Sequence, residues 1–103
     1  MLHEETKNQM FLKTIELLET TVKPMGDGLP LVMKVHFRND AINRIANLFD
    51  DEIINSLFNL KGRMLELKDY SHNSFLFDLK VGELINELSN MIKPTKKELF
   101  YYN

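Results

Sequence analysis

The fold prediction turns on the stretch from Leu29 to Arg38, which reads LPLVMKVHFR. Its side chains alternate between an apolar face, with Leu31, Met33, Val35 and Phe37, and a polar face, with Lys34, His36 and Arg38. Such alternation is typical of a half-buried β-strand, because successive side chains of a strand point to opposite faces of its sheet. The sequence therefore predicts a strand over residues 29–38.

The same period of two returns in the second half of the chain. Residues 65–68, LELK, alternate apolar and charged side chains, and residues 75–81, FLFDLKV, alternate again after the polar turn 70–73. Two alternating runs joined by a short polar turn are typical of a β-hairpin. The sequence therefore predicts two further strands over these two runs.

Elsewhere, apolar residues recur at the helical intervals of three and four. Helices are predicted over about residues 7–22, after a cap at Asn39 or Asp40, from Asp50 to a stop at Gly62, and between Gly82 and Pro94. Residues 25–28, MGDG, are predicted to form a turn after the first helix. The aromatic C-terminal segment 95–103 is predicted to open one more short helix, since Thr95 and Glu98 have the spacing of a capping box.

The resulting order is helix, strand, helix, helix, strand, strand, helix. Strands connected in this way pair most simply as an antiparallel sheet. We therefore predict a single α+β domain over residues 1–103, in which four or five helices back a small three-stranded antiparallel sheet.

Composition agrees with one globular domain and excludes several kinds of site. The 103 residues include no cysteine, which excludes disulfides, thiolate metal ligands and a cysteine nucleophile. Thirteen basic and fifteen acidic residues give a net charge of −2, so no overall field attracts nucleic acid or anionic lipid. The acidic start 1–5 lacks the order of a secretion signal, and no run approaches the about 18 apolar residues of a membrane span. We therefore expect a cytoplasmic protein without membrane contact.

The element order from Ala41 to Val81 resembles that of a winged helix-turn-helix domain, in which two short helices precede a two-stranded wing. The pair Ile45-Ala46 resembles the apolar-small pair of the first helix, Leu57 and Leu60 the buried positions of the recognition helix, and residues 62–66, GRMLE, the entry to the wing. The resemblance implies a winged-helix transcription regulator that binds DNA as a dimer. The nucleic-acid contacts in this alternative are Lys34, Arg38, Arg44, Lys61, Arg63 and His72.

The second helix of this resemblance departs from the pattern, because it begins Asp50-Asp51-Glu52. In a helix-turn-helix, the first residues of the recognition helix approach bases and phosphates, and three carboxylates there would repel them. Acidic residues in a first turn also stabilise a helix through its dipole without any partner. On either explanation, reading of DNA by this helix is disfavoured.

Catalytic and metal-binding patterns are not found in the sequence. His3, His36 and His72 are isolated, so no two histidines share a helix face as metal ligands. Ser71 and His72 are adjacent in a polar turn, where no third group orients the imidazole as a general base requires. The sequence therefore predicts no enzyme, no metal and no cofactor.

Two surfaces are predicted to bind a protein partner. The first is the acidic group Asp40, Asp50, Asp51 and Glu52, and the second is the apolar run Leu99, Phe100, Tyr101 and Tyr102. Tyrosine is enriched at interfaces, so this run is predicted to form a dimer seam or a partner contact, or to dock within the chain against the first helix. The leading hypothesis is a small non-enzymatic cytosolic regulator or inhibitor that acts by protein–protein binding. This hypothesis includes a phage origin, and it includes as target a host enzyme of nucleic-acid handling or defence. Both additions rest on composition alone.

Overall fold

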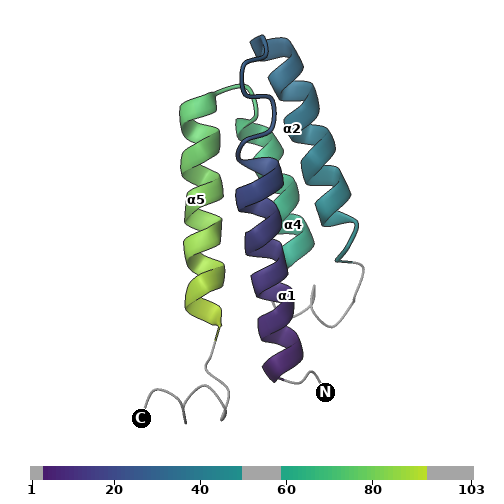
Figure 1. Cartoon of the computed structure of the whole chain (residues 1–103), viewed down its shortest axis with the longest axis vertical. Helices are drawn as coiled ribbons and strands as arrows, with labels where there is room; N and C mark the ends of the chain where they lie inside the picture. The colour runs from purple at the N-terminus through teal and green to yellow at the C-terminus, as the bar shows by residue number, and fades with distance from the viewer. Residues whose placement is uncertain (1–3, 50–58, 93–103) are drawn as a thin grey trace.

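The structure is a computed structural model that describes residues 4–49 and 59–92, and every regular element in these two stretches is helical (Figure 1). The elements are α1 (Glu4–Leu17), the π-helical turn η1 (Leu18–Val22), α2 (Leu31–Ala46), α4 (Leu60–Glu66), the 3-10 turn η2 (Leu67–Tyr70) and α5 (Ser74–Met91). The predicted α+β fold is therefore wrong, because the described residues contain no strand. The helix predicted over residues 7–22 is confirmed as α1 and η1.

Successive helices alternate in direction (Figure 1). Helix α1 runs through the middle of the view, with α5 on one side, α2 on the other, and α4 behind it. Helix α1 packs against α5, and α2 packs against α4. The four helices thus enclose one core, in which the largest fully buried side chains are Phe11, Phe77, Leu18, Ile42, Leu60, Met64 and Leu88.

The strand predicted over residues 29–38 is instead the first half of α2 and the residues that lead into it. Its alternating apolar side chains are not buried on one face: Leu31 and Met33 are exposed, and Val32 is 83% exposed. The buried stripe starts at Arg38 and continues at helical intervals through Ala41, Ile42 and Ile45. Alternation specifies a strand only where one of its faces is covered, and here neither face of residues 31–35 is fully covered.

The hairpin prediction fails for a related reason. Residues 75–81 form the first half of α5, and its buried residues Phe77, Val81, Leu84 and Leu88 are spaced by four, three and four. Phe77 and Val81 fit both a strand and a helix pattern, whereas Phe75, which a strand would bury with them, is 77% exposed. Residues 65–66 end α4, and residues 67–68 begin η2. The turn read as a hairpin is a helix cap, because Asn73 Oδ1 accepts a hydrogen bond from the Leu76 N–H at 3.1 Å.

Glycines mark one predicted boundary correctly and two wrongly. Gly26 and Gly28 have φ of +86° and +80° in the turn between η1 and α2, which confirms the predicted turn. A Cβ at Gly26 would lie 3.1 Å from Lys34 Cα, so this glycine lets the turn pack closely against α2. Gly62 lies inside α4 and Gly82 inside α5, so neither ends or begins a helix.

Candidate binding groove

A hollow of about 540 Å³ lies between η1 and α2. Its wall on the side of α1 and η1 is formed by Leu17, Thr21 and Met25. Its wall on the side of α2 is formed by Phe37, Asp40, Ala41, Arg44, Ile45 and, in the turn that follows, Leu48. Six of these nine side chains are aliphatic, thioether or aromatic, so the hollow, called the groove below, offers a predominantly apolar surface.

The π-helical turn shapes one wall of the groove. In η1 the Lys23 N–H donates to Leu18 O at 2.8 Å, five residues back, and this wider winding places Thr21 and Met25 beside α2. A π-helical turn is rare, and such turns are found frequently at functional sites. A smaller hollow of about 420 Å³ along the following turn shares Thr21 and Met25 with the groove. The recessed surface thus continues past the end of η1.

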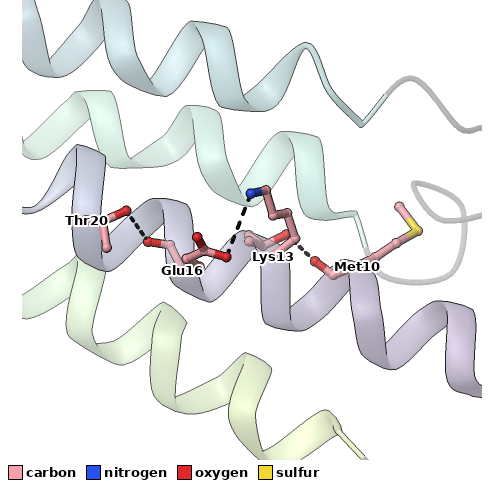
Figure 2. Close-up of polar contacts among 5 residues, drawn as sticks. Met10, Lys13, Glu16 and Thr20 are labelled. Carbon is pink, nitrogen blue, oxygen red and sulfur yellow. Dashed lines mark hydrogen bonds and ion pairs between the residues drawn. The ribbon is translucent and has the colours of Figure 1, made fainter.

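The other face of α1 is an ordinary solvated surface. Figure 2 shows Lys13 paired with Glu16 at 3.7 Å, and the Thr20 hydroxyl donating to Glu16 O at 2.7 Å. Exposed ion pairs at this spacing contribute only about 0.3–0.5 kcal/mol. We therefore place the candidate site on the side of α1 that faces α2.

The groove has one charged couple at its rim. Asp40 Oδ2 lies 3.0 Å from Arg44 Nη2, four residues along α2, and the Arg44 side chain is 80% exposed. Leu48 is exposed at one end of the groove. The groove thus combines an apolar surface with one acidic and one basic side chain, Asp40 and Arg44. Such a surface is suited to binding apolar side chains that are flanked by polar ones.

Of the predicted protein-binding residues, the structure places Asp40 at the groove. Asp50, Asp51 and Glu52 lie outside the described residues, as does the run Leu99, Phe100, Tyr101 and Tyr102. The predicted clustering of Asp40 with the other three carboxylates is therefore not described. What the structure adds is a basic partner for Asp40, four residues away on the same helix.

The six residues of the nucleic-acid alternative are spread over α2, α4 and the turn before α5. Arg38 is 3% exposed, so its guanidinium has almost no surface to offer. Arg44 pairs with Asp40, and Arg63 of α4 pairs with Glu87 of α5. Lys34 is half-buried beside Gly26, Lys61 is half-buried on α4, and His72 is exposed in the turn.

Arg38 holds α2 to the turn before α5. Its Nη1 donates to Ser71 O at 2.9 Å, and its Nη2 donates to Ser74 Oγ at 3.0 Å. The guanidinium carbon lies 4.8 Å from the centre of the Phe77 ring, and Nε has no hydrogen-bond partner. No carboxylate of the described residues pairs with this cation, so hydrogen bonds and the aromatic face compensate its burial.

Sequence reasoning missed most of the groove. The alternation over residues 29–38 predicts a strand that includes Phe37, although Phe37, Ala41, Arg44 and Leu48 follow one another at intervals of four, three and four. That spacing is a helix stripe and was available in the sequence. The contribution of Leu17, Thr21 and Met25 had no comparable signal, because it depends on how η1 packs against α2.

A smaller hollow of about 190 Å³ lies between α4, η2 and α5, and charged side chains form most of its lining. No group of three or more His, Cys, Asp or Glu residues in the described part of the chain is placed to hold a metal ion. None of its helices is both long and apolar enough to cross a bilayer. No protein family, curated protein or solved structure matches the chain. The groove is therefore the feature of the described residues from which a function is proposed.

Proposed function

We propose that this protein is a non-enzymatic binding protein, and that it acts by holding an apolar segment of a protein chain in the groove between η1 and α2. The observation that carries this proposal is the groove of about 540 Å³, whose walls are mainly apolar and open to solvent. Burial of apolar surface is the main driving force of protein association, at roughly 25 cal/mol per Å² of area removed from water.

The chemistry of the rim supports binding rather than catalysis. Asp40 and Arg44 are paired with each other on the surface, and the groove residues include no histidine. A regulator that works by docking fits this surface. The target class predicted from composition, a host enzyme of nucleic-acid handling or defence, stays a prediction.

The test compares two exposed leucines. Leu48 is 64% exposed at the groove, and Leu12 is 54% exposed on α1 and does not line the groove. Leu48→Asp places a carboxylate against the apolar contact, whereas Leu12→Asp makes the same chemical change elsewhere. Both sites are solvent-exposed, so we expect both variants to fold, which circular dichroism checks.

The measurement is quantitative affinity capture from a bacterial lysate, with and without nuclease treatment, by the full chain and both variants. We expect proteins retained by the parent and by Leu12→Asp to be lost at least about tenfold with Leu48→Asp, because an unpaired charge in an apolar contact costs more than about 1.4 kcal/mol. Equal retention by Leu48→Asp and the parent would exclude the groove. Retention that disappears on nuclease treatment would favour a nucleic-acid partner instead.

A further inference from the structure

We infer that the segment held in the groove is α2 of a second copy of this chain, so that the protein forms a two-fold dimer with its α2 helices antiparallel. The inference rests on the proposed function in one respect, namely that the same groove is the contact surface. It is carried by the order of charged and apolar side chains along α2.

One side of α2 presents a continuous stripe. Met33, Phe37, Ala41 and Arg44 recur at intervals of four and three, and Leu48 follows four residues later. At about 100° per residue these positions share one side of the helix, and Asp40 lies beside them. Met33 and Leu48 are exposed at the two ends of the stripe, and Phe37 is half-buried. At 1.5 Å per residue the helical part of the stripe, from Met33 to Arg44, is about 16 Å long, and Leu48 extends it into the turn after α2.

The order of charged and apolar side chains along the stripe is complementary to the same order in an antiparallel copy of α2. From Phe37 to Leu48 it reads apolar, acidic, apolar, basic and apolar, with the charged residues Asp40 and Arg44 on either side of residue 42. In an antiparallel pair with its two-fold axis near residue 42, Asp40 of each copy faces Arg44 of the other. Phe37 of each copy then meets the region of Leu48 of the other, and that exposed leucine lies over the apolar groove.

Other occupants of the groove would leave the charges of Asp40 and Arg44 less well paired. A parallel pair would place Asp40 opposite Asp40 and Arg44 opposite Arg44, which is repulsive. A foreign apolar segment without charges would cover Asp40 and Arg44 without adding a partner for either. A two-fold contact uses one patch twice, so each acid and each base of the stripe gains a partner of opposite charge.

The test uses two charge reversals that each break the complementarity. Asp40→Arg makes both charged positions of the stripe basic, and Arg44→Asp makes both acidic. In either variant alone, like charges meet across the axis. In an equimolar mixture of the two variants, a basic stripe can pair with an acidic one. The contact within one helix between positions 40 and 44 is broken in both variants, and mixing cannot restore it.

Sedimentation velocity of the full chain, at concentrations from about 1 to 500 μM, measures the association, since small interfaces give affinities in this range. We expect the parent to dimerise, each variant alone to dissociate at least about tenfold more readily, and the mixture to regain association to within about threefold of the parent. Circular dichroism confirms that each variant retains its helix content.

Three results would overturn the inference: a parent that stays monomeric throughout the range, a dimer that both reversals leave intact, or a mixture that associates no better than its components. These results are distinct from failure of the proposed function. If the parent is monomeric but Leu48→Asp still abolishes capture, the groove binds a foreign segment. If dimerisation follows the predicted pattern but capture is unchanged by Leu48→Asp, the groove serves self-association and the captured proteins bind elsewhere.

Discussion

Two arginines six residues apart on α2 show how differently one helix can use the same side chain. Arg38 is buried, with hydrogen bonds to Ser71 O and Ser74 Oγ and with no carboxylate partner among the described residues. Arg44 is exposed and pairs with Asp40 at the groove. The first arginine joins parts of the core, and the second belongs to a surface. Residue type alone gave both the same predicted role in nucleic-acid binding.

The energetic consequences differ because the surroundings differ. Loss of a buried, hydrogen-bonded cation leaves its partners unsatisfied and opens space in a packed region. Loss of an exposed ion pair costs little, because water and salt already screen it. The predictions below test this contrast between the buried side of the bundle and the surface, in order of decreasing effect.

The largest effect is expected from the ring beneath the Arg38 guanidinium. Phe77 is fully buried, and Phe77→Ala should lower the free energy of unfolding by about 3–5 kcal/mol, through lost apolar burial and the cavity that remains. Urea denaturation followed by circular dichroism measures this change. The matched control is Phe75→Ala, two residues away and largely exposed, which we expect to cost less than about 0.5 kcal/mol. Equal losses in the free energy of unfolding would contradict the helical register of α5. They would favour a strand that places both rings on one face.

Arg38 itself should come next. Arg38→Ala is expected to lower the free energy of unfolding by about 2–4 kcal/mol, because Ser71 O and Ser74 Oγ lose their donor and the side-chain volume is lost. Arg38→Met also removes both donors and the charge but keeps much of the side-chain volume, so it should destabilise the protein less than Arg38→Ala does. A methionine variant as unstable as the alanine variant would show that the lost hydrogen bonds, and not the lost volume, account for the effect.

Arg44 should give the smallest effect. Arg44→Ala removes an exposed pair at the i,i+4 spacing, and we expect a loss of about 0.2–0.5 kcal/mol, measured by urea denaturation at a protein concentration low enough to keep the chain monomeric. In about 1 M salt this difference should vanish, because the Debye length falls to about 3 Å. The effect of Arg38→Ala should persist in the same salt, since its contacts are buried. A salt-sensitive Arg38 effect would place that side chain nearer to solvent than the structure does.

Only part of the candidate site was predictable. Asp40 was singled out for its charge, but its partner Arg44 was assigned to a different function, because charge alone does not say which residues lie together. A helical reading of the stripe from Phe37 to Leu48 would have brought both onto one surface. The strand prediction prevented this by ending the alternating run at Arg38.

The helix over residues 7–22 and the turn at Gly26 and Gly28 follow from the sequence by itself, because apolar spacing and glycine conformation are local properties of the chain. The sequence alone also excluded cysteine chemistry. Only the tertiary structure decided that residues 31–38 and 75–81 are helical. In both runs the apolar residues fit a period of two as well as a helix, and the choice depends on which side chains the neighbouring helices cover. The packing of the helices likewise decided that Arg38 is buried and Arg44 exposed, because burial is a property of the packed chain and not of any one residue.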